Sequence, residues 1–188
     1  MQIHIDEESR RTAALALWRY GHDYLKAAQA LCDHDHVTCN ESQALYHLAA
    51  QGIEFALKSY LRAKGVAPGE LSARVGHSLR DALQAALARG LASPPPEVMR
   101  AIQFIAPHHR DGQFRYLTGR YGELPDLAPL LAAGTWILNQ IASDVVADYF
   151  ANRGHGRLPA LDALGRDDML RRMRADLQLT ASKIPTLQ

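Results

Sequence analysis

The sequence has few cysteines, no marked excess of either charge and no long apolar run, and each absence excludes a class of protein. Two cysteines among 188 residues, Cys32 and Cys39, are too few for a disulfide framework, so we expect both to remain thiols in a reducing compartment. The formal net charge of +1, from 21 Lys and Arg against 20 Asp and Glu, excludes a global field that would draw the chain to nucleic acid or anionic lipid.

The sequence also lacks the segments that would take a chain to or through a membrane. No run of about 18 apolar residues is present, and the opening MQIHIDEESRR has no apolar signal-peptide core. We therefore predict a cytoplasmic protein that makes no contact with a membrane.

What the sequence does have is enough apolar residues for one large core. Its hydrophobic content of 47% over 188 residues fits a single domain, and a chain of this length buries about 70% of the surface that its unfolded form exposes. Arginine supplies 17 of the 21 basic residues. Clusters of arginine favour bidentate contacts with phosphate or carboxylate.

The clearest helical pattern runs from Leu45 to Gly65, where glycine ends the helix. On its polar face, Glu54 and Lys58 have the spacing of a solvated ion pair. Because Glu54 also borders the apolar stripe, partial burial beside an arginine is the alternative. The apolar residues are spaced to share one face of the helix, and they are Leu45, Leu48, Ala49, Ile53, Ala56, Leu57, Tyr60 and Leu61.

Apolar spacing and capping residues predict further helices on both sides of this one. Glycines at Gly21 and Gly52 predict that the first two helices pack antiparallel and cross closely there. The segment from Pro107 to Pro125 does not have a helical pattern, and a small hairpin is possible within it. The other expected helices run from Asp6 or Ser9 to about Asp33, from a Ser78 cap to Gly90, from Ser93 to Pro107, from Asp126 to Asn152, and onward from an Asp167 cap.

These elements predict an all-α fold, an up-down bundle of four to five helices plus a C-terminal helix. We expect residues 1–152 to form the bundle. Residues 153–188 form a C-terminal extension with one short amphipathic helix, which belongs either to the same domain or to a dimer interface.

One helix carries the pattern A-x-x-x-x-E-x-x-L-K-x-x-L-x-x-x-G, followed after about a dozen residues by H-x-L-x-x-x-L. With the helix order from about Ala13 to Tyr149, this pattern resembles the HEPN superfamily of small helical bundles. The residues that carry it are Ala49, Glu54, Leu57, Lys58, Leu61 and Gly65, then His77, Leu79 and Leu83.

Similarity to that family implies a homodimer without a cofactor. In its active members an Arg-x(4–6)-His motif from each subunit lines the dimer cleft and cleaves RNA without metal. In this chain no arginine precedes a histidine at that spacing. The nearest pair, Arg100 and His108, has seven residues between them, including Pro107. The resemblance therefore implies a protein that binds RNA or nucleotide without the standard catalytic motif, in a stress, toxin-antitoxin or defence setting.

The strongest candidate site is the segment 108–121, in which imidazole, guanidinium and phenol groups are concentrated. Such side chains bind phosphate and stack on bases, and a histidine there can act as acid or base. The alternative is a surface loop pinned by its apolar residues. Candidate catalytic residues are His108, His109 and Arg115, and candidate ligand-binding residues are Arg110, Tyr116, Arg120, Tyr121 and His77.

Two further histidine-containing positions have both a structural and a functional interpretation. His77, at the start of a helix, is either a capping or buried hydrogen-bonding residue that sets the helix entry or part of the site. The run from Cys32 to Cys39 offers four possible zinc ligands, Cys32, His34, His36 and Cys39. Its spacing matches no standard zinc knuckle, so we expect a polar loop and no metal.

Three functions remain open from the sequence. The first is an HEPN-like dimer that binds RNA or nucleotide. The second is a divergent, metal-independent endoribonuclease that uses the 108–121 loop. The third is a non-catalytic module that binds a cognate protein partner.

Overall fold

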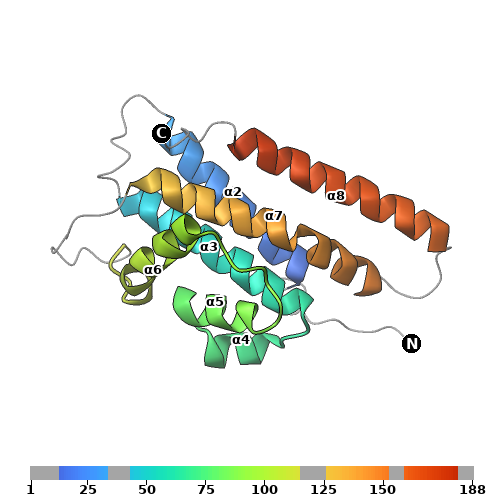
Figure 1. The fold of residues 1–188 in the computed structure, drawn as a ribbon, viewed down its shortest axis with the longest axis horizontal. Coiled ribbons are helices and arrows are strands. Elements are labelled where there is room, and N and C mark those ends of the chain that lie inside the picture. The colour runs from blue at the N-terminus through green and yellow to red at the C-terminus, as the bar shows by residue number, and fades with distance from the viewer. Residues whose placement is uncertain (1–12, 34–42, 115–125, 153–158, 182–188) are drawn as a thin grey trace.

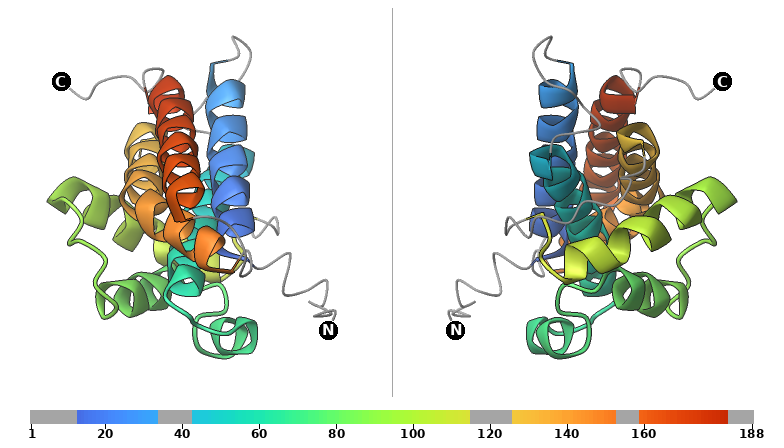
Figure 2. Two further views of the ribbon diagram at one scale, coloured as in Figure 1. Left: turned by 90° about the vertical axis from the view of Figure 1, so that its right-hand side faces the viewer. Right: turned by 90° about the vertical axis from the view of Figure 1, so that its left-hand side faces the viewer.

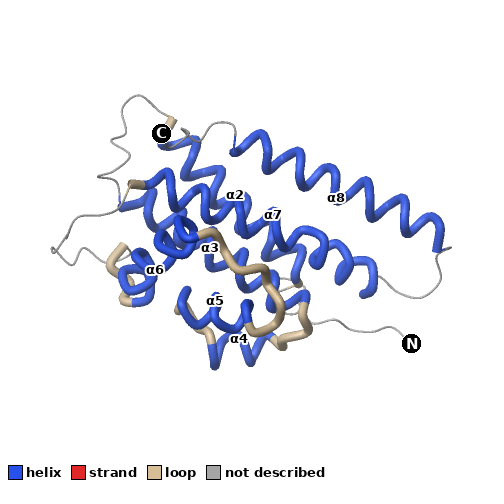
Figure 3. Tube along the Cα trace, in the orientation of Figure 1, coloured by secondary structure: helices blue, strands red, loops and turns tan. Residues whose placement is uncertain are grey.

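A computed structural model of the chain confirms the all-α prediction. The structure describes residues 13–33, 43–114, 126–152 and 159–181, and these ranges contain seven helices and no strand (Figures 1 and 3). The helices are α2 (Ala14–Cys32), α3 (Gln43–Ala63), α4 (Pro68–Arg74), α5 (Leu79–Leu87), α6 (Pro96–Arg110), α7 (Leu127–Asn152) and α8 (Pro159–Ala181).

Helix α3 is the central element of the bundle. It packs against α2, α7, α5 and α6, and its apolar residues are almost completely buried. Figure 1 shows α4 and α5 on one side of the bundle and α8 along the opposite side. In Figure 2, α8 lies between α7 and α2. Each long helix therefore has its own apolar face covered by a neighbour, as the spacing of its apolar residues requires.

The predicted antiparallel crossing of the first two helices is confirmed. The hydroxyl of Ser59 donates to the carbonyl of Ala14 over 2.7 Å. Gly21, about two turns after Ala14, lies against Gly52, about two turns before Ser59, so the two helices run in opposite directions. A Cβ built on Gly21 would lie 3.0 Å from the Gly52 carbonyl oxygen. The two backbones approach so closely only because neither residue has a side chain.

Some helix boundaries agree with the sequence-based expectations and others differ from them. Gly65 does end α3, with a φ of +83°, but Pro68 begins the short helix α4, because proline is tolerated in a first turn. Ser78 caps α5 as predicted, accepting from the Asp81 amide over 3.2 Å. Helix α8 begins at Pro159, well before the Asp167 cap.

The largest departure is at the end of α6, where the sequence predicts a helix that stops at Pro107. The helix instead continues through Pro107 to Arg110. A proline inside a helix removes one backbone hydrogen bond and costs about 3 kcal/mol. The following turn still makes backbone bonds, with the Asp111 amide donating to the Pro107 carbonyl over 3.0 Å. It also places His109 in the interior.

Helix α7 qualifies the expectation that no segment could span a membrane. By length and composition alone this 26-residue helix could cross a membrane, because it contains an 18-residue window with a mean hydropathy of 1.3. In the structure, however, 61% of that window is buried in the bundle. Trp18 of α2 donates its indole N–H to the Leu138 carbonyl in the middle of α7 over 3.0 Å. Such burial is typical of the core helix of a bundle. The cytoplasmic location stays a prediction.

Helix α8 packs along α7 and also contacts α2. Met173 and Leu177 are buried, and Leu170 is half-buried against the core, as the amphipathic pattern predicts. Whether residues 153–188 also form an interface between two chains stays a prediction.

The glycine crossing predicts the effect of a single added methyl group. Gly21→Ala should lower the free energy of unfolding by about 1–3 kcal/mol, because the new Cβ meets backbone atoms that cannot turn away. The matched control is Gly69→Ala in α4, where an added Cβ meets nothing within 4 Å. That variant should be neutral or up to about 1 kcal/mol more stable. Equal stability of the two variants in urea unfolding would contradict the crossing.

Candidate functional site

The candidate site is built on the polar face of α3. His47, Gln51, Glu54 and Lys58 recur at intervals of three or four residues and so share this face. The helical spacing predicts that Glu54 and Lys58 are solvated. In the structure, however, the Glu54 side chain is only 2% exposed and the Lys58 side chain 16% exposed. The solvated-pair interpretation is therefore wrong, and the partial-burial alternative is nearer, with histidine in place of arginine.

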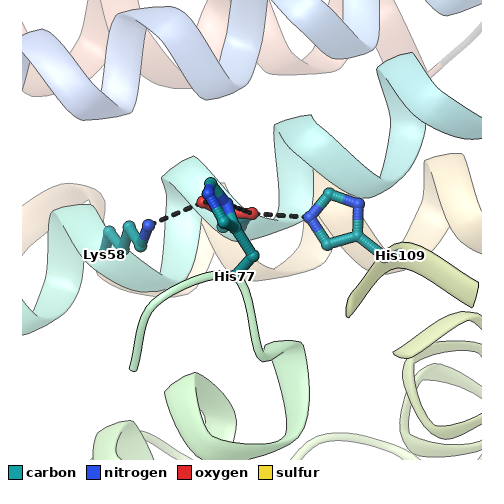
Figure 4. Close-up of polar contacts among 4 residues, drawn as sticks. Lys58, His77 and His109 are labelled. Carbon is teal, nitrogen blue, oxygen red and sulfur yellow. Dashed lines mark hydrogen bonds and ion pairs between the residues drawn. The ribbon is translucent and has the colours of Figure 1, made fainter. Parts of the chain in front are cut away.

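Three side chains from three parts of the chain donate to the Glu54 carboxylate (Figure 4). Lys58 Nζ, one turn along α3, lies 2.6 Å from Oε1. His109 Nε2, in the last turn of α6, lies 2.5 Å from Oε2. His77 Nδ1, in the turn before α5, lies 3.2 Å from both oxygens. The carboxylate thus links α3 to the end of α6 and to the start of α5.

These donors determine the charge state of Glu54. Burial has the largest influence on its pKa and raises it. The hydrogen bond from His109, together with the charge and hydrogen bond of Lys58, outweighs burial and lowers the pKa from 4.5 to about 2. Glu54 is therefore an ionised acceptor at neutral pH, and it forms a buried ion pair with Lys58.

The hydrogen-bond pattern also assigns the ring proton of His109. The side chain is 1% exposed, and Nε2 faces a carboxylate that can only accept, so the proton is on Nε2. Nδ1 is buried and has no hydrogen-bond partner among the described residues. The rings of His47 and His77 each have their centroids 6.5 Å from that of His109. Two histidines thus contact the Glu54 carboxylate, and a third, His47, lies beside the ring of His109.

The two described candidate catalytic residues, His108 and His109, face different directions. His109 is buried against Glu54, whereas His108 is half-buried, and its Nδ1 lies 2.6 Å from Gln113 Oε1. Arg115 lies outside the described residues, as do three candidate ligand-binding residues, Tyr116, Arg120 and Tyr121, and most of the possible hairpin.

The other two candidate ligand-binding residues are described. Arg110 is exposed, and its Nε lies 2.9 Å from Asp111 Oδ1. His77 is 55% exposed and takes part in the Glu54 cluster. The cap of α5 is the neighbouring Ser78, so the capping interpretation of His77 is wrong. His77 is hydrogen-bonded as the other interpretation predicts, but it is exposed and not buried.

A second surface that sequence reasoning missed lies on the outer side of α6. Arg100, Phe104 and His108 are spaced four residues apart and form one stripe. Phe104 is 43% exposed, and its ring stacks on that of His108 with centroids 5.7 Å apart and planes at 28°. Beside it is an open groove of about 350 Å³ between α6 and the first turns of α7. The signal available in the sequence was the four-residue spacing, which the assumed stop at Pro107 concealed.

The zinc alternative in the loop between α2 and α3 is only partly described. Cys32, half-buried at the end of α2, is disulfide-bonded, which corrects the expectation of a free thiol. A sulfur in a disulfide is not the thiolate that zinc requires. The other possible ligands, His34, His36 and Cys39, lie outside the described residues.

Comparison of the chain with protein-family models, with curated proteins and with solved structures returns no match.

The lowered pKa of Glu54 predicts a specific dependence of stability on pH. Because the folded-state pKa lies below its ordinary value, the carboxylate contribution is full above about pH 4.5 and is lost as the pH falls towards 2. Glu54→Gln should therefore be less stable than the parent by about 3 kcal/mol at pH 7, at about 1.4 kcal/mol per pKa unit, and this gap should narrow by pH 3.

The measurement is denaturant unfolding of both proteins at the two pH values. Glu97→Gln, at an exposed position in the first turn of α6, is the control and should stay within about 0.5 kcal/mol of the parent. A gap between Glu54→Gln and the parent that is as large at pH 3 as at pH 7 would show that the carboxylate charge is not what stabilises the fold.

Proposed function

We propose that the protein is an HEPN-like dimeric helical protein that binds RNA or nucleotide through the outer side of α6. The observation that carries this proposal is the stacked pair of the exposed Phe104 and the half-buried His108. Two exposed arginines are near it in the sequence of α6, Arg100 on the same stripe and Arg110 at the end of the helix. Aromatic side chains at a protein surface stack on bases with little sequence preference, and nearby arginines neutralise phosphate.

The two arginines are available for such contacts. Arg100 is exposed, and its Nε makes only a long bond, 3.4 Å, to the Pro96 carbonyl of its own helix. Arg110 pairs with Asp111 at a site where both side chains are about half exposed or more. An exposed ion pair of this kind contributes at most about 1 kcal/mol to the stability of the fold. A phosphate group can therefore displace the Asp111 carboxylate from Arg110.

The geometry favours binding over cleavage. Acid-base catalysis on RNA requires a histidine that reaches the ribose, but His109 is buried and its Nε2 is committed to Glu54. Arg100 and His108 lie on one face, yet eight residues of helix place them about 12 Å apart along the axis. Phe104 occupies the position between them. They are thus arranged to contact successive groups of a ligand instead of one scissile phosphate.

Two further parts of the proposal rest on the resemblance to the HEPN superfamily. Dimerisation and a cognate protein partner, in a stress, toxin-antitoxin or defence setting, follow from what members of that family do. The open apolar groove beside Phe104 supports a surface that contacts another molecule.

Removal of the Phe104 ring tests the proposal. Phe104→Ala should weaken binding of single-stranded RNA by about 5- to 150-fold at low salt, since stacking on one base contributes about 1–3 kcal/mol. Tyr20→Ala is the matched control, because Tyr20 of α2 is 44% exposed and Phe104 43%. Fluorescence anisotropy with a labelled oligonucleotide measures both.

Three results of this experiment would contradict the proposal or part of it. If the parent protein binds no RNA even at low salt, where phosphate contacts are strongest, the proposal is wrong. If Phe104→Ala and Tyr20→Ala weaken RNA binding equally, the α6 surface is not the binding site. If the parent cleaves the RNA and His108→Ala does not, the endoribonuclease alternative is correct.

A further inference from the structure

The geometry points to a binding site for one divalent transition-metal ion formed by Glu54, His77 and His109. One carboxylate oxygen and one ring nitrogen from each histidine lie within 4.8 Å of one another. Two imidazoles and one carboxylate are a ligand set typical of zinc and non-haem iron, with further positions filled by water. This site is separate from the α6 surface and does not depend on the proposed function.

The positions of the ligand atoms are close to those that an ion requires. Zinc bonds nitrogen and oxygen at about 2.1 Å, so two tetrahedral ligand atoms stand about 3.4 Å apart. His77 Nδ1 is already 3.2 Å from Oε2 of Glu54. His109 Nε2 is 2.5 Å from the same oxygen and must move apart by about 1 Å. That shift replaces a hydrogen bond by two bonds to the ion.

The Glu54 carboxylate also has one oxygen available for an ion. Its other oxygen, Oε1, is held by Lys58 at 2.6 Å, which leaves Oε2 for the metal. Hydrogen bonds to the outer oxygen of a ligating carboxylate are usual in metal sites. To bind the ion, His109 must give up the proton on Nε2, because a ligating ring nitrogen carries no proton.

Two features set the strength and the access of the site. The Nδ1 proton of His109 finds no acceptor among the described residues, and Lys58 adds a neighbouring positive charge, so we expect moderate affinity. His77 is 55% exposed, which gives an ion a path from solvent to the buried carboxylate. As His77 Nδ1 becomes a ligand, its Nε2–H can face water.

The experiment is a titration of the untagged, full-length protein with Zn²⁺ alone at pH 7.5, read as bound metal per chain after equilibrium dialysis. The parent should bind one equivalent. His77→Ala should weaken Zn²⁺ binding by at least about 10- to 100-fold. In known metal sites, loss of a residue that only hydrogen-bonds to a ligand already has an effect of this size. Because His77 is exposed, this variant should keep the fold. His108→Ala removes a neighbouring imidazole outside the cluster and should bind Zn²⁺ like the parent.

Two further measurements distinguish this site from the cysteine-containing loop. A His34→Ala/His36→Ala double variant should retain the ion, and Co²⁺ bound to the parent should show no thiolate-to-cobalt charge-transfer band. The proposal is overturned if the parent binds no stoichiometric Zn²⁺, if His77→Ala binds as tightly as the parent, or if the double variant loses the ion. RNA binding by the Phe104 surface can succeed or fail independently of each of these results.

Discussion

An ionised carboxylate buried in the central helix is the constraint on which the rest of the structure depends. Leaving Glu54 charged and unpaired in the core would cost several kcal/mol. Lys58, His77 and His109 supply the donors that avoid this cost, and two of them come from outside α3. The apolar faces bring the helices together in a non-directional way. The carboxylate instead requires a particular turn before α5 and a particular end to α6.

The unusual end of α6 follows from this requirement. Continuing a helix through Pro107 loses a backbone bond, yet it is this additional turn that carries His109 to Glu54. Neighbouring residues on a helix point about 100° apart. Burial of His109 therefore turns His108 outward onto Phe104. One buried interaction thus produces both the interior histidine cluster, where we place a metal ion, and the exposed ring pair, where we place a base.

The sequence predicts those features that depend on neighbours along the chain. Apolar spacing locates α2, α3, α5, α6 and α7, and the glycines locate the crossing of α2 with α3. The site depends instead on contacts between residues 23 and 55 positions apart, from Glu54 to His77 and to His109. No local pattern contains these contacts. The rule that proline ends a helix placed the end of α6 one turn too early. The spacing of an i, i+4 ion pair predicted a solvated Glu54, whose carboxylate is in fact buried.

The central claim is that Glu54 and His109 stabilise the fold as a pair, and a double-mutant cycle tests it most directly. Glu54→Met and His109→Phe replace each partner by an apolar side chain of similar size. Each single variant leaves a buried polar group unpaired and should be strongly destabilised. The double variant should be more stable than the sum of the two losses predicts, with a coupling free energy of about 1–3 kcal/mol. Losses that add without coupling would contradict the account.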